Sequence, residues 1–217
     1  MSKKPLLSSA AVVTLVLAGG LGTLLAGTFA YTQFANSGDK FADCRVGAVA
    51  GGGGDIGGPF ELVDETGKTV TDKDVITGPT LVYFGYTFCP DVCPLDASRN
   101  AEAVTLLQER GYSVKPVFIS IDAERDTPEA LAEFTDVMHP DMLGLTGTEE
   151  QLKQASLAYR TYFKKQPADD GDDDYYLIDH STFSYFMLPD AGFVDFVRHE
   201  EPAEAVAKRL QCFLDKG

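Results

Sequence analysis

Two cysteines near the middle of the chain, Cys89 and Cys93, combine a short spacing with surroundings that favour reactive thiolates. They belong to the segment CPDVCP (89–94), which directly follows the apolar run Leu81–Tyr86. A buried strand is expected to end there and a helix to begin. Thiolates at such a turn can exchange electrons through a disulfide or hold a soft metal ion. The plain alternative is a buried or disulfide-bonded pair with a structural role.

The helix expected after the cysteines would favour the thiolate form of Cys93. The N-terminal end of a helix carries partial positive charge and free N–H groups, which stabilise an anion. Pro94 suits the first helical position, where a missing N–H costs nothing. The sequence predicts a helix over 95–110 that Gly111 ends, because apolar residues recur at helical spacing, namely Ala97, Ala101, Val104 and Leu107.

The order of the remaining elements predicts an α/β layer fold with a central mixed sheet and an N-terminal hairpin. Turn residues separate the two strands of that hairpin, 60–63 and 69–70. The cysteines would then lie at the carboxyl end of a central strand, where sites in open sheets form. Strands are predicted over 81–86, 114–121, 143–145, 183–188 and 193–197. Three further helices are predicted, one that begins at 126, one over 148–163 and one over 202–215.

The N-terminal part of the chain predicts a membrane anchor over 10–31. The segment Ala10–Ala30 carries no charge and is long enough to cross a bilayer as a helix. Lys3 and Lys4 precede it, so residues 1–9 are expected to stay in the cytoplasm. A cleaved signal peptide is the alternative. Both interpretations place the folded part outside the cytoplasmic membrane, where disulfides persist.

A glycine-rich segment, 32–59, is expected to form a flexible tether to a folded domain over 60–217. It contains Gly51–Gly54 and a second glycine pair, a composition typical of flexible linkers. A domain of about 160 residues can bury a proper core. The formal net charge of the chain is −15, which argues against a nucleic-acid partner. That charge suits a partner with a basic docking face, or solubility alone.

Three motifs of the chain together resemble the signatures of the Sco/SenC family. They are YFGYTFCPDVCP (83–94), SIDAERDTP (120–128) and DHSTF (179–183). The likeness runs from about Phe60 to the end of the chain and includes the N-terminal anchor. It implies a thioredoxin-like fold, copper binding, and a role in assembling the dinuclear copper centre of cytochrome c oxidase subunit II.

The same resemblance implies which residues hold the copper. The family uses two cysteines and a distant histidine, and these correspond to Cys89, Cys93 and His180. The chain departs from many relatives at Phe88, where they carry a histidine that is not a ligand. Two thiolates and one imidazole form a soft donor set that suits Cu(I) or Cu(II), whereas a structural zinc site would take a fourth protein ligand. A three-ligand site leaves room for the ligands of a partner to attack the ion.

Functions of two classes fit these residues. The first is a copper metallochaperone in the bacterial inner membrane, with its C-terminal domain in the periplasm and subunit II as its partner. A periplasmic copper donor or thiol reductant would serve it. The second is an enzyme-like thiol–disulfide reductase that uses Cys89 and Cys93 as a redox-active pair to keep the partner's cysteines reduced. Redox sensing is a further possibility. His180 distinguishes the two classes, because disulfide exchange does not require it.

The remaining residues of chemical interest carry weaker signals. His139 and His199 are expected on the surface, and the acidic run Asp169–Asp174 is expected to be a solvated loop. Cys212 would point away from the apolar stripe of the last helix, which favours a disulfide with Cys44. A free or intermolecular cysteine is the alternative.

Overall fold

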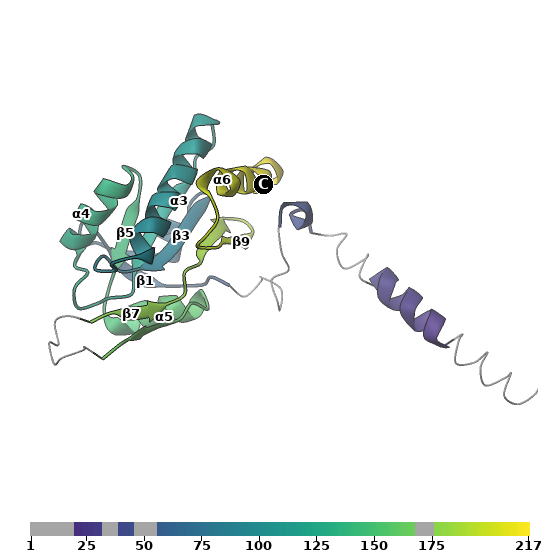
Figure 1. The fold of residues 1–217 in the computed structure, drawn as a ribbon, viewed down its shortest axis with the longest axis horizontal. Helices are drawn as coiled ribbons and strands as arrows, with labels where there is room; N and C mark the ends of the chain where they lie inside the picture. Colours follow the sequence, from purple (N-terminus) through teal and green to yellow (C-terminus); the bar gives the residue numbers. More distant parts are fainter. Residues whose placement is uncertain (1–19, 32–38, 46–55, 168–175) are drawn as a thin grey trace, which may run out of the picture. The chain divides into compact units, whose positions relative to one another are not determined.

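We describe a computed structural model of the 217-residue chain, which covers residues 20–31, 39–45, 56–167 and 176–217 (Figure 1). The chain divides into two compact units, Met1–Asp43 and Cys44–Gly217. A helix occupies residues 20–31 of the first unit. None of the helices in the described parts of the chain combines the length and the apolar character needed to cross a membrane.

Several expected N-terminal features lie partly or wholly outside the described residues. The expected cytoplasmic segment, 1–9, lies outside them, as does the first half of the expected anchor, 10–31. Of the expected tether, 32–59, the described residues include a short 3-10 helix, η1 (Ala42–Cys44). The acidic run Asp169–Asp174 also lies outside the described residues.

The second unit is built on a seven-stranded mixed sheet with the order β2-β1-β5-β4-β3-β8-β9. The three central strands, β5, β4 and β3, run parallel, while β1 and β8 pair antiparallel with β5 and β3. All six residues of β3 are buried, as expected for a continuous apolar run in the middle of a sheet. The strands are β1 (Glu61–Asp64), β2 (Thr69–Thr71), β3 (Thr80–Gly85), β4 (Lys115–Ser120), β5 (Leu143–Thr146), β8 (Ser184–Leu188) and β9 (Gly192–Val197).

Helices flank this sheet, which confirms the predicted α/β thioredoxin-like fold (Figure 1). Helix α3 (Val92–Glu109) packs against α4 and α6, and helix α5 (Glu149–Ala158) packs against β1. Two predicted helix starts are confirmed by their caps: Thr127 accepts a hydrogen bond from the N–H of Ala130, and Thr148 forms a capping box with Gln151. The helices are α2 (Asp72–Val75), α3 (Val92–Glu109), α4 (Pro128–Met138), α5 (Glu149–Ala158) and α6 (Ala203–Lys216).

A small second sheet differs from the sequence prediction. The helix predicted to continue to 163 ends at Ala158, and Arg160 adopts a positive φ of 52° that a helix cannot contain. The chain then enters β6 (Phe163–Lys165), which pairs antiparallel with β7 (Ile178–His180). We call this two-stranded sheet the β6–β7 ribbon. It carries His180, which lies outside all of the strands predicted from the sequence.

A disulfide between Cys44 and Cys212 joins the start of the second unit to α6. The two Cα atoms lie 5.6 Å apart, within the normal range for a disulfide. The apolar face of α6 is buried through Val206, Leu210 and Phe213, whereas Cys212 is half-buried beside that stripe. The predicted bridge is therefore confirmed, and the alternative of a free or intermolecular cysteine is wrong.

Candidate metal centre

Cys89 and Cys93 lie where β3 gives way to α3, as the sequence predicts. The helix begins at Val92 rather than at 95, so Cys93 lies inside its first turn and Pro94 is its third residue. The proline is still tolerated, because first-turn N–H groups have no partner within the helix. The backbone N–H of Cys93 instead donates to Sγ of Cys89 over 3.4 Å. The helix start therefore places an N–H donor on the neighbouring sulfur.

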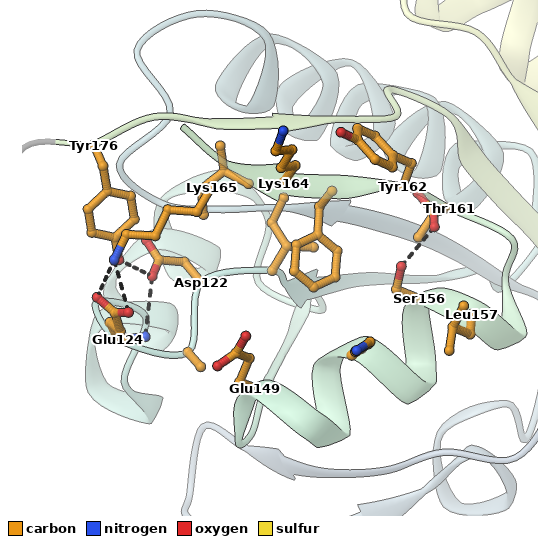
Figure 2. A pocket seen from close by; sticks show the side chains of 15 residues that line it. Asp122, Glu124, Glu149, Ser156, Leu157, Thr161, Tyr162, Lys164, Lys165 and Tyr176 are labelled. Atoms are coloured by element: carbon orange, nitrogen blue, oxygen red, sulfur yellow. Dashed lines mark hydrogen bonds and ion pairs between the residues drawn. The ribbon is translucent and has the colours of Figure 1, made fainter. Parts of the chain in front are cut away.

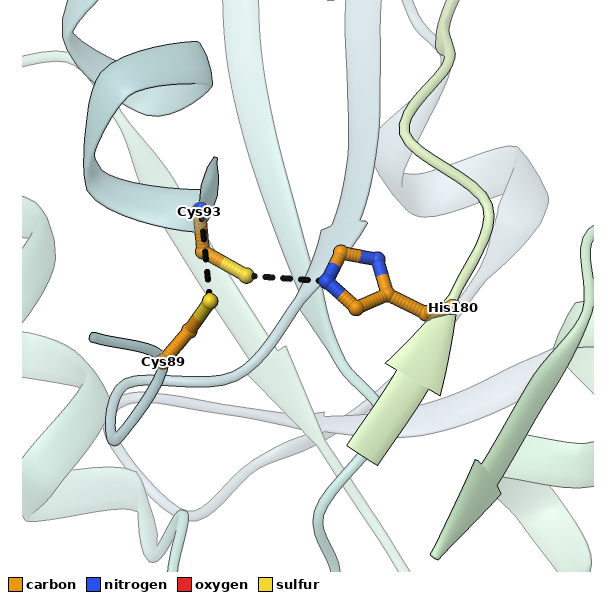
Figure 3. A group of neighbouring side chains, drawn as sticks. All are labelled: Cys89, Cys93 and His180. Atoms are coloured by element: carbon orange, nitrogen blue, oxygen red, sulfur yellow. Dashed lines mark hydrogen bonds between the residues drawn. The ribbon is translucent and has the colours of Figure 1, made fainter. Parts of the chain in front are cut away.

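His180 approaches the same sulfurs from the end of β7 (Figure 3). Its Nε2 atom lies 3.2 Å from Sγ of Cys93. Its Nδ1 atom donates to the backbone carbonyl of Ser181 over 2.9 Å. Because a carbonyl can only accept, this contact keeps the proton of the neutral ring on Nδ1. The lone pair of Nε2 therefore faces the thiols.

The three side chains form one compact group of donors. The ligand atoms of Cys89, Cys93 and His180 all lie within 4.8 Å of one another. Cys93 is fully buried, Cys89 is 8% exposed and His180 is half-buried. Within the described parts of the chain, this is the group in which three or more histidine, cysteine or carboxylate side chains could share a metal ion. It contains no fourth donor, so a closed structural zinc site is not formed there.

Aromatic rings and a glycine hold this group from the side of the main sheet. The rings of Tyr83 and Tyr86 meet the imidazole of His180 edge-on, with centroids 6.4 Å and 5.9 Å away. Gly85 lies directly behind the sulfur, because a Cβ atom at this position would be 3.1 Å from Sγ of Cys93. The end of β3 therefore leaves space for the thiol and limits how far it can move.

The two thiols differ strongly in acidity. The hydrogen bond with the Cys93 thiol, followed by the contact with His180 and by backbone N–H groups, holds the pKa of Cys89 well below its usual range. Burial raises the pKa of Cys93, and the neighbouring Cys89 adds to that effect. Cys89 is therefore the thiol that ionises first, and Cys93 keeps its proton until a metal or a reaction partner removes it.

Known proteins with a similar sequence identify the family of this chain. A family model described as SCO1/SenC matches residues 49–215. The chain belongs to the SCO1/SenC family. Protein SenC of Rhodobacter capsulatus is 56% identical over 178 residues, which are 82% of this chain and 78% of that protein.

More distant relatives of this SCO1/SenC protein share the same fold. The mitochondrial SCO1 homolog 1 of Arabidopsis thaliana is 44% identical over 142 residues, which are 65% of this chain and 42% of that protein. This chain therefore spans less than half the length of that relative. The structure of Arabidopsis thaliana ScoI with copper bound matches with a TM-score of 0.69 at 38% identity. The match covers 74% of this chain and 99% of that one.

A separate cavity of about 460 Å³ lies between α5 and the β6–β7 ribbon of this SCO1/SenC protein (Figure 2). Apolar side chains of Ile121, Phe163 and Ile178 line it together with charged residues such as Glu149 and Lys165. None of its lining residues is a cysteine or a histidine. The cavity therefore offers no soft metal donor, and the chemistry of the protein is better assigned to the thiol–imidazole group.

The other two histidines lie outside the donor group, and one of them differs from the sequence prediction. His139, expected on the surface, is buried with 6% exposure, and its Nδ1 atom accepts a hydrogen bond from the backbone N–H of Asp141. His199, also expected on the surface, is half-buried, with Nδ1 3.1 Å from the carboxylate of buried Asp96. The expectation was wrong for His139, because its ring accepts a local hydrogen bond at the end of α4, whereas His199 remains partly exposed and pairs with a distant residue of α3.

Sequence reasoning did not single out the residues that frame the donors. Tyr83, Gly85 and Tyr86 belong to an apolar run and therefore look like ordinary strand residues. The glycine within an otherwise bulky strand was the available signal, since it indicates a close approach of another group. The contact of the two tyrosines with His180 depends on long-range folding and has no local signature.

Proposed function

We propose that this protein binds copper through Sγ of Cys89, Sγ of Cys93 and Nε2 of His180. The observation that carries the proposal is the convergence of these three soft donors within 4.8 Å, on two different elements of the fold. Thiolate and imidazole donors together suit both Cu(I) and Cu(II). Membership of the SCO1/SenC family and the likeness to a copper-bound ScoI support the choice of metal.

The copper is cargo in this proposal, and its acceptor is the dinuclear copper centre of cytochrome c oxidase subunit II. Cys89 offers a ready thiolate, and Cys93 releases its proton when copper is loaded. Three protein donors leave the ion open to attack by the thiolates of a partner, which permits exchange without complete release into solution. A periplasmic copper donor would load the site, or a thiol reductant would return Cys89 and Cys93 to the reduced state.

The proposed setting is the bacterial inner membrane. Residues 10–31 would cross it once, with residues 1–9 in the cytoplasm, and residues 32–59 would link the anchor to a periplasmic copper-binding domain over 60–217. The uncharged segment Ala10–Ala30 and the disulfide at Cys44 support this arrangement. The acidic character of the whole chain argues against a nucleic-acid partner.

A second candidate function is thiol–disulfide reduction, with Cys89 and Cys93 as the redox-active pair. The observation that favours it is the unequal acidity of the two thiols, since a thiolate at Cys89 and a more deeply buried, protonated thiol at Cys93 suit attack and resolution in turn. Such a protein would reduce the copper-ligand cysteines of its partner or report on the redox state of the compartment. His180 is not needed for either of these roles.

Copper titration of the reduced full chain tests the two candidates. We expect wild type to bind one copper ion and each of Cys89→Ser, Cys93→Ser and His180→Ala to lose at least about tenfold in affinity, since each removes one of three ligands. His199→Gln is the matched control, because this histidine lies outside the donor group. If His180→Ala binds copper as tightly as wild type, the site is wrong; if it loses copper but still reduces disulfides, both functions coexist.

A further inference from the structure

The donor group is divided between two sheets that have little in common. Cys89 and Cys93 follow β3 of the main sheet, whereas His180 ends β7 of the separate β6–β7 ribbon. A metal site that spans two sheets requires something to fix the distance between them. The residue that does so should contact both the cysteine segment and the ribbon.

Tyr86 makes such a contact. It follows β3 by one residue and precedes Cys89 by three, so it belongs to the cysteine segment. Its hydroxyl accepts a hydrogen bond of 3.2 Å from the backbone N–H of Ile178, two residues before His180 on β7. The bond therefore joins the strand that carries the histidine to the segment that carries the thiols.

The pairing of the ribbon explains why this N–H is available. The hydrogen bonds toward the β6 side involve the carbonyl of Leu177, which accepts from Gln166, and the N–H of Ser181, which donates to Tyr162. Backbone groups alternate along an antiparallel strand, so the N–H of Ile178 points to the opposite edge of β7. The Tyr86 hydroxyl satisfies this outward N–H at that edge.

The ring of Tyr86 adds a second contact with the histidine itself. It lies nearly perpendicular to the imidazole of His180, at 85°, with the centroids 5.9 Å apart. This is the favourable edge-on arrangement of two rings.

We propose that Tyr86 is a positioning residue for the metal centre, whose hydroxyl holds β7 so that Nε2 of His180 faces the two thiols. This inference rests on the proposed copper function and adds a residue to it. The ring of Tyr86 is 2% exposed and would pack equally well as phenylalanine. Tyr86→Phe therefore removes the hydrogen bond and leaves the packing, which separates positioning from a merely structural role.

Hydrogen exchange of the metal-free full chain tests the tie between the two elements. We expect the amide of Ile178 to exchange several-fold faster in Tyr86→Phe than in wild type, because its acceptor is lost. Tyr185→Phe is the matched control, since Tyr185 is equally buried, on β8, and its hydroxyl bonds to Thr161 instead. Unchanged exchange at Ile178 in Tyr86→Phe would overturn the proposal.

Copper binding tests the consequence for the site. We expect Tyr86→Phe to bind copper about threefold to tenfold more weakly than wild type, the range for one lost hydrogen bond. Its Cu(II) form should also show an altered thiolate-to-copper charge-transfer band, while Tyr185→Phe matches wild type in both respects. In a His180→Ala background, Tyr86→Phe should have almost no further effect, because it acts through the histidine.

The outcomes separate the inference from the function on which it rests. Equal affinity and equal spectra for wild type and Tyr86→Phe would overturn the positioning role alone. An undiminished effect of Tyr86→Phe in the His180→Ala background would also overturn it, since the tyrosine would then act by another route. Failure of wild type to bind copper would overturn the proposed function and this inference with it.

Discussion

Sγ of Cys93 lies 3.2 Å from Nε2 of His180, although 87 positions separate the two residues in the sequence. The contact joins the first turn of α3 to the end of β7. Within the described residues no fourth histidine, cysteine or carboxylate belongs to this donor group, so the three-donor site requires both elements in place. Its properties should therefore respond to the redox state, to the acidity of the thiols and to the space behind Cys93.

Oxidation of the cysteine pair should abolish copper binding. A disulfide between Cys89 and Cys93 would remove both thiolates and leave a single imidazole, which is too few donors for tight binding. The measurement compares copper per protein for oxidised and reduced full chain, followed by re-reduction with a dithiol. Re-reduction should restore loading. Equal loading of the oxidised and reduced forms would contradict the assignment of the thiols as ligands.

The two thiols should be alkylated over different pH ranges. The lowered pKa of Cys89 means that its thiolate already exists in mildly acidic solution, so its rate should change little between about pH 5 and 8. The raised pKa of Cys93 keeps that thiol protonated and unreactive over the same range. Iodoacetamide labelling followed by peptide mapping measures both rates.

The matched variant for this experiment is His180→Ala. Because His180 contributes to the low pKa of Cys89, its removal should move the onset of Cys89 labelling to higher pH. Preferential labelling of Cys93 in the wild-type protein would show that the order of ionisation is reversed.

Gly85→Ala should displace the thiol of Cys93 and lower the stability of the protein. The new Cβ would lie 2.8 Å from Cε1 of Tyr83 and 3.1 Å from Sγ of Cys93, so the sulfur and the ring must move. Overpacking of this kind costs about 1–3 kcal/mol of unfolding free energy. Copper affinity should fall as well, because Cys93 is displaced.

Gly78→Ala provides the control for that substitution. A Cβ atom at Gly78 meets no atom within 4 Å, so stability and copper affinity should stay close to wild type. Denaturant unfolding and copper titration of both variants measure the difference. Wild-type affinity in Gly85→Ala would mean that Cys93 does not depend on the space behind it.

Loss of the Cys44–Cys212 disulfide should destabilise the folded unit without changing its copper site. The bond closes a loop with a sequence separation of 168, for which the chain-entropy model gives about 5 kcal/mol as an upper value. We expect the Cys44→Ser/Cys212→Ser double variant to unfold at lower denaturant concentration and to bind copper as wild type does. Unchanged stability would contradict this prediction, because it would mean that the disulfide does not restrict the conformational entropy of the unfolded chain.

The main sheet could be predicted from the sequence because its central strands are continuous apolar runs. The observed bounds of β3 and β4 differ from the prediction by one residue at each end, and the capping residues Thr127 and Thr148 marked two helix starts. The β6–β7 ribbon was missed because β6 is a three-residue strand, FKK, with half-buried and exposed side chains. Such a strand has no apolar alternation to identify it.

Only part of the candidate site could be predicted from the sequence. The spacing of Cys89 and Cys93 after a buried run was sufficient to identify them, because both residues and their helix are local in sequence. His180 entered through its motif and the resemblance to a family, since no local pattern connects it with the cysteines. The role of Tyr86 depends on one hydrogen bond to a distant backbone N–H, which sequence patterns do not record.

The Cys44–Cys212 bond also makes the attachment of the start of the second unit permanent. Because Cys44 is the first residue of the second unit, the N-terminal edge of that unit stays attached to α6 even when noncovalent contacts nearby, such as the hydrogen bond from Nε of Arg45 to the carbonyl of Val194, open transiently.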